Sequence, residues 1–114
     1  MIVGIRGATS IENNTKEEII SRTIELYTQI IEKNNIKRII SIFCSVTPDI
    51  TAYNPITAIR ENFKLDNVAL FTLQEAVFEN SPKAIIRLLI HCEGDTQNFV
   101  YLHKAKDLRK DIIK

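Results

Sequence analysis

One apolar run in the second half of the chain decides the fold, and it reads Ala84-Ile85-Ile86-Arg87-Leu88-Leu89-Ile90. Branched aliphatic residues at this density predict a strand in the core of a sheet. Arg87 interrupts the run, and its guanidinium keeps its charge at any ordinary pH. Burying such a charge is costly unless an anion lies beside it. The run therefore predicts either an internal carboxylate partner for Arg87 or a site for an anionic or electron-rich ligand.

Arg87 has a second interpretation, as a residue on the solvated face of its strand. In that case it would point to the same side as His91. Ile85 and Leu89 share that side in a strand of period two, so the face is expected to be more apolar than a solvated one. The apolar neighbours on this face favour a functional role for Arg87 over a place on a solvated face.

The first 35 residues predict a strand followed by a helix. Residues 2–6 form a short alternating strand that is expected to end at Gly7. Thr15 begins a capping-box pattern in which Glu18 reaches back, and it opens a helix over residues 16–33. The apolar positions at helical spacing are Ile20, Ile24, Tyr27 and Ile31.

The rest of the chain predicts one short helix among several strands. Residues 38–46 form a buried strand, and Asn54 caps a helix that starts at Pro55 and runs to about Asn62. The expected inward face of the buried strand consists of Ile40, Ile42, Cys44 and Val46. Further strands are expected over residues 67–73, 84–92 and 98–104. This order predicts one α+β domain over residues 1–114, with a mixed β-sheet and helices on one face, rather than a doubly wound fold.

Composition narrows the possible partners. The 114 residues carry 15 basic and 14 acidic side chains, and no block of like charge stands out. We therefore expect no nucleic-acid partner and no membrane partner. No stretch resembles a signal peptide or a membrane span, so we expect a cytoplasmic protein in which Cys44 and Cys92 are buried reduced thiols. His91 and His103 lack metal-ligand spacing with either cysteine, and no metal site is expected.

Three more residues are candidates for chemistry. Arg6 lies near a strand end, Glu75 follows an apolar run, and Tyr101 lies between Val100 and Leu102. Taken singly, Arg6 is expected at the surface, Glu75 suits a turn as well as a site, and Tyr101 suits the core. The chain has no glycine-rich phosphate loop, no GxSxG elbow and no CxxC pair, and nothing in it indicates covalent catalysis. Arginines with one glutamate and one tyrosine at strand positions suit a small polyanion.

Several short motifs in order resemble the AroH-type chorismate mutases, and together they cover nearly the whole chain. The motifs are Gly4-Ile5-Arg6-Gly7-Ala8-Thr9, Thr47-Pro48-Asp49-Ile50-Thr51-Ala52, Pro55 with Arg60, Leu73-Gln74-Glu75, Arg87, Val100-Tyr101-Leu102 and Leu108-Arg109. The resemblance implies a homotrimeric pseudo-α/β-barrel with active sites in clefts between subunits. It also implies an isomerase that converts chorismate to prephenate in phenylalanine and tyrosine biosynthesis, a Claisen rearrangement without cofactor or covalent intermediate.

The resemblance implies a role for each matching residue. Arg87 would donate to the ether oxygen of chorismate, where negative charge gathers, and Glu75 would accept from the substrate hydroxyl. Arg6 would hold a carboxylate, with Tyr101 donating to the same region. The remaining substrate-binding residues would be Phe71, Thr72, Leu73 and Gln74 along the cleft, Asn54 and Arg60 from the adjacent subunit, and Leu108 and Arg109 from the tail.

The chain departs from the family pattern at three places. Thr72 stands where the family often has cysteine, and Asn54 stands where it often has an aromatic residue at the rim of the cleft. The tail, which ends at Lys114, is shorter than usual. Threonine keeps a hydrogen-bonding group, whereas Asn54 is expected to serve as a helix cap and leave the cleft wall thinner.

Two other functions compete with this one. The first is a small trimeric protein of the enamine/imine deaminase type, which also binds carboxylates with interface arginines. The second is a non-catalytic module for ligand sensing or subunit interaction, in which Arg87 and Glu75 merely pair with each other. The joint match of Glu75 and Arg87 to the family spacing favours the chorismate mutase.

Overall fold

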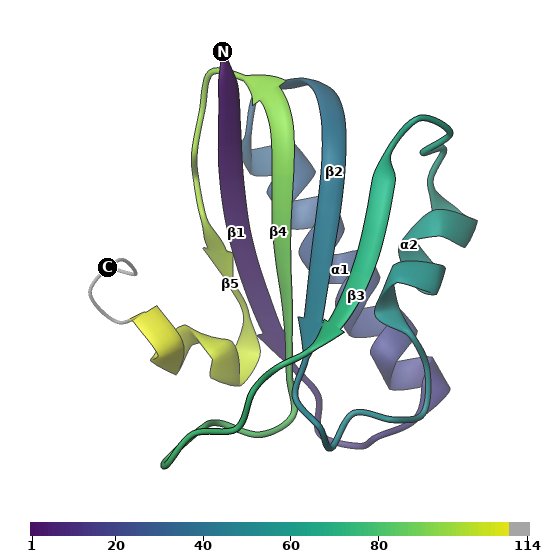
Figure 1. Cartoon of the computed structure of the whole chain (residues 1–114), viewed down its shortest axis with the longest axis vertical. Coiled ribbons are helices and arrows are strands. Elements are labelled where there is room, and N and C mark those ends of the chain that lie inside the picture. Colours follow the sequence, from purple (N-terminus) through teal and green to yellow (C-terminus); the bar gives the residue numbers. More distant parts are fainter. Residues whose placement is uncertain (110–114) are drawn as a thin grey trace.

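A computed structural model describes residues 1–109, with the side chain of Arg109 outside the described part. Its centre is one mixed five-stranded sheet in the order β3-β2-β4-β1-β5 (Figure 1). β4 runs antiparallel to both β1 and β2, whereas β3 pairs with β2 and β5 with β1 in parallel. The strands are β1 (Ile2–Ser10), β2 (Ile36–Val46), β3 (Ala69–Gln74), β4 (Ile85–Gly94) and β5 (Val100–Tyr101).

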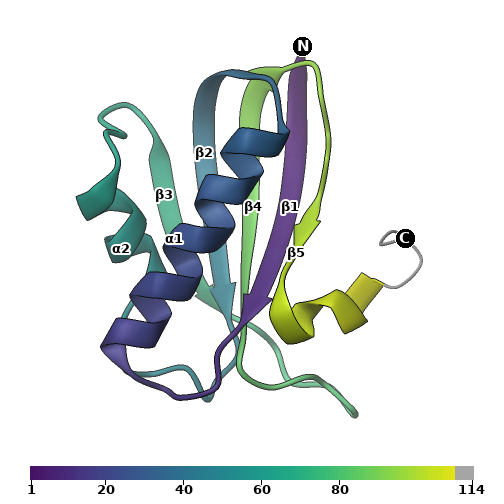
Figure 2. The same cartoon turned by 180° about the vertical axis from the view of Figure 1, so that it is seen from behind.

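Two α-helices, α1 (Lys16–Lys33) and α2 (Pro55–Asn62), cover one face of the sheet, as Figure 2 shows from behind. A 3-10 helix, η1 (His103–Arg109), follows β5 at the sheet edge. No helix in the described part of the chain is long and apolar enough to cross a membrane. The predicted α+β class, the mixed sheet and the placement of the helices on one face are confirmed.

The start of α1 shows the predicted cap with one difference. The Thr15 hydroxyl accepts a hydrogen bond from the Glu18 amide at 3.2 Å. The Glu18 carboxylate reaches back beyond the cap residue, to the amides of Glu12 and Asn13. These amides precede the helix, so Glu18 fixes the loop that enters it rather than closing a capping box.

The buried face of α1 is rotated from the predicted one. Its fully buried residues are Ile19, Thr23, Leu26, Tyr27 and Ile30, whereas Ile20 and Ile24 are only half-buried. Two adjacent apolar rows run along this helix, and the sequence alone does not choose between them.

β1 is longer than predicted, because Gly7 lies inside the strand and does not end it. The pairing of β1 with β4 continues to Ser10, which lies opposite Ile85. The strand predicted over residues 98–104 is in turn shorter, because the chain leaves the sheet after Tyr101 and enters η1 at His103, whose φ is 53°. The apolar residues that predicted a strand over 98–104 gave no indication of the helix η1.

β2 contains an irregularity that changes its inward face. Ile39 lies opposite Cys92 and Ser41 lies opposite His91, so Ile40 is the extra residue of a bulge. Ile39, rather than the predicted Ile40, packs against the core, while Ile42 and Cys44 are fully buried as predicted. Cys44 and Cys92 are both free and buried, which confirms the expected burial.

Candidate active site

Arg87 lies on the face of the sheet that the helices leave open. Side chains of β4 alternate, so that Leu88 and Ile90 enter the core while Arg87 and Leu89 point to the open face. The Arg87 side chain is 39% exposed, in contrast to the fully buried side chains of Ile86 and Leu88 beside it. The alternation of a strand explains the difference, since one aliphatic run serves both faces of the sheet.

Glu75 is the carboxylate partner of Arg87, which corresponds to one of the two alternatives that the sequence left open. Oε1 of Glu75 lies 2.6 Å from Nε of Arg87, and the glutamate side chain is only 18% exposed. The contact is an ion pair without the alignment of a hydrogen bond, because the buried Nε atom has no hydrogen-bond partner among the described residues. The backbone of Glu75 is fixed to β2, because its amide donates to the Val46 carbonyl at 2.9 Å.

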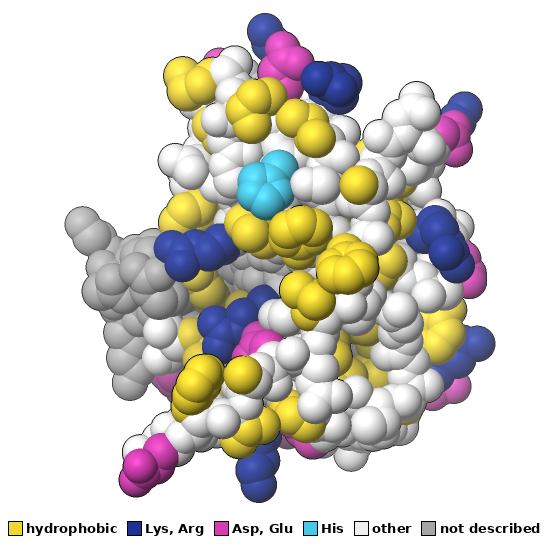
Figure 3. All heavy atoms as spheres, in the orientation of Figure 1, with side chains coloured by type: hydrophobic (Ala, Val, Ile, Leu, Met, Phe, Trp, Pro, Cys, Tyr) yellow, Lys and Arg dark blue, Asp and Glu magenta, His cyan; other side chains and the backbone are white. Residues whose placement is uncertain are grey.

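A hollow of about 260 Å³ adjoins Arg87 on this open face. Figure 3 shows the face directly, with basic, acidic and hydrophobic side chains around a depression. The hollow contains three of the four predicted catalytic residues and a largely apolar lining. The lining residues are Arg6, Gly7, Ala8, Phe43, Ser45, Leu73, Arg87, Leu88, Leu89 and Tyr101.

Glu75 borders a second, more open hollow that shares Ser45 and Arg87 with the first. The Glu75–Arg87 pair therefore lies where the two hollows meet. This position leaves one carboxylate and the two arginines of the site, Arg6 and Arg87, near a common apolar space. Such a space suits a small molecule with anionic groups and a compact ring.

Arg6 and Tyr101 have polar groups available at this hollow. The Arg6 guanidinium lies over the Phe99 ring at 4.8 Å and makes no ion pair with any described residue. Tyr101 is 8% exposed, and its hydroxyl has no hydrogen-bond partner among residues 1–109. Both groups can therefore bind a ligand without first breaking a contact to another polar side chain.

The predicted β3 residues divide between the two faces of the sheet. Leu73 lines the hollow, and Phe71 is exposed on the same face with its ring edge-on to Phe43. Thr72 faces the helices instead, where its hydroxyl donates to Oδ1 of Asn54 at 2.9 Å. Gln74 is exposed at the strand end and does not line the hollow.

Asn54 and Arg60 do not reach this hollow within one chain. Oδ1 of Asn54 accepts from the Ile56 amide at 3.0 Å, so Asn54 is the helix cap that the sequence predicted. Arg60 is exposed in the last turn of α2. Their predicted role from an adjacent subunit stays a prediction.

The C-terminal helix η1 is attached beside Tyr101. Leu108 packs against the small cluster that Tyr101 forms with Ala8, Ile85 and Ala105. The predicted role of the Arg109 side chain falls outside the described residues.

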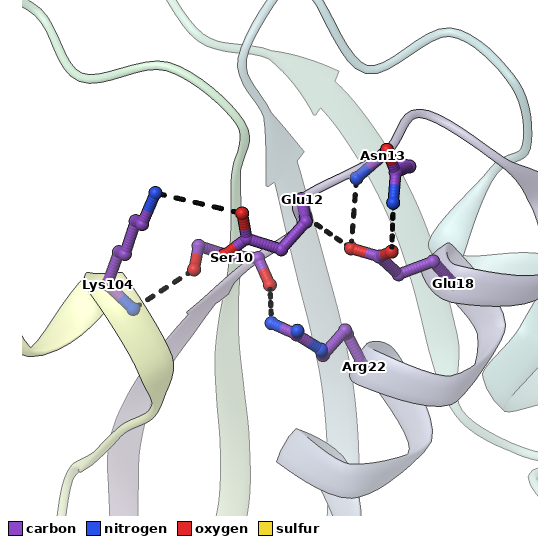
Figure 4. Close-up of polar contacts among 6 residues, drawn as sticks. All are labelled: Ser10, Glu12, Asn13, Glu18, Arg22 and Lys104. Atoms are coloured by element: carbon purple, nitrogen blue, oxygen red, sulfur yellow. Dashed lines mark hydrogen bonds and ion pairs between the residues drawn. The ribbon is translucent and has the colours of Figure 1, made fainter.

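Ser10 connects η1 to the rest of the fold (Figure 4). Its hydroxyl accepts from the Lys104 amide at 3.0 Å, while its carbonyl accepts from Nη1 of Arg22 at 2.6 Å. A longer contact of 3.8 Å joins Lys104 Nζ to Glu12. The last residue of β1 thus holds both α1 and η1.

Phe43 and Ser45 line the hollow, although neither was among the predicted site residues. Both belong to β2 and point away from Ile42 and Cys44. The alternation of Ser41, Phe43 and Ser45 with the buried residues Ile42 and Cys44 was a usable signal, because a strand buried on both faces seldom carries two serines on one face.

Cys44 is not available as a nucleophile. Burial, with a smaller contribution from the Glu75 charge, raises the pKa of its thiol to about 12. The thiolate, which is the reactive form, is therefore scarce near neutral pH. Among residues 1–109 no three histidine, cysteine, aspartate or glutamate side chains lie close enough together to hold a metal ion.

Comparisons with known proteins agree on one family. Residues 2–112 match the family described as chorismate mutase type I. The chain is 36% identical to chorismate mutase AroH of Bacillus subtilis, over 98% of this chain and 93% of that protein. It is 33% identical to chorismate mutase AroH of Thermus thermophilus, over 98% and 97%.

A solved structure gives the same result for the fold. The chorismate mutase from Clostridium thermocellum superposes with a TM-score of 0.85 and 34% identity, covering 92% of this chain and 98% of that one. The sequence match extends across nearly the whole length, and the fold agrees with it. The chain belongs to the chorismate mutase type I family.

Proposed function

We propose that the hollow at Arg6, Arg87 and Tyr101 is the substrate site in which this chain, as a chorismate mutase, rearranges chorismate to prephenate. Family membership makes the chain an isomerase of aromatic amino-acid biosynthesis. The observation that carries the assignment of the site is the convergence of two arginines and one free tyrosine hydroxyl on one apolar hollow, with Glu75 beside it.

The reaction needs shape and charge stabilisation more than acid–base chemistry. The bond from the ether oxygen to the ring breaks while a carbon–carbon bond forms within the same molecule. The substrate must therefore be held in its compact, diaxial shape. Negative charge collects on the ether oxygen as its bond breaks, so donors placed there lower the barrier.

Arg87 is the donor to that oxygen. A guanidinium has five N–H groups in a fixed plane, and Glu75 contacts only Nε. The terminal nitrogens remain for the substrate. Glu75 keeps Oε2 for the substrate hydroxyl, since its described contacts are all made by Oε1.

Arg6 and Tyr101 bind a carboxylate of the substrate. Arg6 follows Ile5 on the strand next to β4, and Tyr101 comes from β5 on the far side of β1. Their donors therefore approach the hollow from the side opposite to Glu75, which orients an anionic ligand along the sheet.

The homotrimer is part of the proposal. The face that contains the hollow also exposes three large apolar side chains, with Phe43 39%, Phe71 56% and Leu73 45% exposed. A second subunit covering this face would remove them from water. It would also allow Asn54, Arg60 and the C-terminal tail to act at the hollow of a neighbour. A cytoplasmic location remains a prediction.

The competing functions receive less support. Arg87 and Glu75 do pair, as the interaction-module hypothesis requires, but the pair leaves the terminal nitrogens of Arg87, the Arg6 guanidinium and the Tyr101 hydroxyl for a ligand. The enamine/imine deaminase type is disfavoured because sequence and fold both match chorismate mutases.

A direct assay tests the proposed function. Purified protein is mixed with chorismate, and the loss of chorismate and the appearance of prephenate are followed against a protein-free control. We expect acceleration by several orders of magnitude over the spontaneous reaction. A rate equal to the control would overturn the proposal, and elution as a stable monomer would overturn its trimeric part.

A further inference from the structure

The ion pair between Glu75 and Arg87 crosses a strand that belongs to neither residue. Arg87 is on β4 and Glu75 directly follows β3, while β2 runs between these two strands. Ser45 is the residue of β2 at the crossing, because it lies opposite Arg87 in one direction and opposite Leu73 in the other. Its side chain points to the open face, toward the pair.

The Ser45 hydroxyl contacts the same carboxylate oxygen as the arginine. Oγ of Ser45 donates to Oε1 of Glu75 at 2.8 Å, and Nε of Arg87 lies 2.6 Å from that oxygen. One oxygen thus has two fixed neighbours, whereas Oε2 has no described partner. With Oε1 held from two strands, the direction of Oε2 is fixed as well.

We infer that Ser45 is a positioning residue for the rearrangement. Ser45 acts through Glu75 and Arg87 and does not touch the reacting atoms. This inference rests on the proposed function of the hollow. By holding Oε1, the hydroxyl keeps Oε2 turned to the substrate and keeps the guanidinium plane of Arg87 in its catalytic orientation. The ion pair alone cannot do this, because its Nε contact lacks hydrogen-bond alignment.

Ser45 contributes to the pair through its hydroxyl, which donates to Oε1 of Glu75. Alanine would fit but would leave Oε1 with the poorly aligned Nε contact alone. Threonine keeps the hydroxyl and suits a strand, so it is the conservative replacement.

The test begins with Ser45→Ala and Ser45→Thr. A hydrogen bond to a charged group contributes enough that we expect Ser45→Ala to lower kcat about 10- to 100-fold, with KM changed by roughly threefold or less. Ser45→Thr should recover most of that loss. Equal kcat values for wild type and Ser45→Ala would overturn the inference, as would a Ser45→Thr variant no better than Ser45→Ala.

Ser41→Ala is the matched control. Ser41 lies on the same strand and face, and its hydroxyl hydrogen-bonds Nδ1 of His91 at 3.1 Å instead of a residue of the site. Loss of a serine hydroxyl from the open face is common to both variants. We expect Ser41→Ala to keep kcat within about twofold, and an equal loss in both variants would show a general effect on the sheet and overturn the inference.

A double-mutant cycle tests whether Ser45 acts through Glu75. In a Glu75→Gln background, Ser45→Ala should lower kcat much less than it does in the wild type, because the carboxylate that it orients is gone. Fully multiplicative losses in the double variant would mean that Ser45 acts by another route, and the inference would fail.

A readout independent of turnover separates this inference from the proposed function. In the NMR spectrum of the uncomplexed protein, the Arg87 Nε–H signal should move and exchange faster with solvent in Ser45→Ala but not in Ser41→Ala. If the wild type does not rearrange chorismate, the proposed function fails, and this signal still decides whether Ser45 orders the pair. An unchanged Arg87 signal in Ser45→Ala overturns the ordering role.

Discussion

Gly7 of β1 packs directly against the side chain of Ile30 of α1. A Cβ atom at position 7 would lie 2.6 Å from Cδ1 of Ile30 and 3.1 Å from the carbonyl oxygen of Val100. The helix therefore packs on the strand at the point where β1 also borders β5. Arg6 and Ala8, the neighbours of Gly7 in β1, line the hollow on the open face.

The first prediction concerns this contact. Gly7→Ala should lower the free energy of unfolding by about 1–3 kcal/mol, because the Val100 carbonyl cannot move aside as a flexible side chain can. Urea denaturation measures the change. Gly4→Ala is the control, since a Cβ there meets only ordinary contacts at 3.7 Å and should change stability by less than about 1 kcal/mol. Equal losses in both variants would contradict the role assigned to the close packing around Gly7.

The second prediction tests the geometry of Arg87 rather than its charge. Lysine at this position keeps the charge but loses the planar set of donors. Arg87→Lys should therefore lower kcat/KM by roughly 10²- to 10³-fold, the scale of a lost donor to a developing oxyanion. Steady-state kinetics with chorismate measure this loss.

The control for that variant is Arg38→Lys. Arg38 is an exposed arginine. Its Nη2 atom lies 3.6 Å from Glu93, whereas Nε of Arg87 lies 2.6 Å from Glu75. We expect its substitution to leave kcat/KM unchanged within about twofold. An Arg87→Lys variant that keeps wild-type kinetics while remaining folded would show that charge alone suffices.

The third prediction concerns Asn54, which joins α2 to β3. Asn54→Ala removes the acceptor for both the Ile56 amide and the Thr72 hydroxyl, and should cost about 1–2 kcal/mol of stability. Asn54→Asp keeps a side-chain oxygen at both contacts and should cost about 0.5 kcal/mol or less. Thermal unfolding followed by circular dichroism compares the two. Indistinguishable melting temperatures for Asn54→Ala and the wild type would mean that the cap contributes nothing.

The fourth prediction follows from the raised pKa of Cys44. The folded thiol titrates at about 12, against a usual value of 9.0, so the folded state holds this proton at pH values where the unfolded state has released it. This contribution to stability is complete below pH 9 and is lost as the pH rises from 9 toward 12. Denaturant titrations across that range should show a shallower alkaline loss in Cys44→Ala than in the wild type.

The reactivity of the same thiol gives an independent measurement. At pH 8 an alkylating reagent should modify Cys44 slowly in the folded protein and rapidly in denaturant, because the thiolate is scarce and the side chain is buried. Mass spectrometry of peptides that contain Cys44 follows both rates. Rapid modification of the folded protein would contradict the burial and the pKa together.

Features that depend on neighbours in the chain were predictable from the sequence. The starts of α1 and α2 follow from Thr15 and from Asn54 with Pro55, because an N-terminal cap satisfies backbone amides within the first turn. The central strand around Arg87, the α+β class and the family motifs are likewise readable in order along the chain. Local chemistry and spacing are enough for these features.

Other features depend on residues far apart in the chain, and only the tertiary structure decided them. The face that α1 buries, the strand that continues through Gly7 and the bulge at Ile40 are set by the partners that pack there. The sequence predicted either an internal carboxylate or an anionic or electron-rich ligand beside Arg87, and it offered Glu75 as a candidate. It could not show that β2 would run between them, because strand order is a property of the folded sheet. That order alone places the Ser45 hydroxyl beneath the ion pair, where one small side chain contacts the carboxylate of the site.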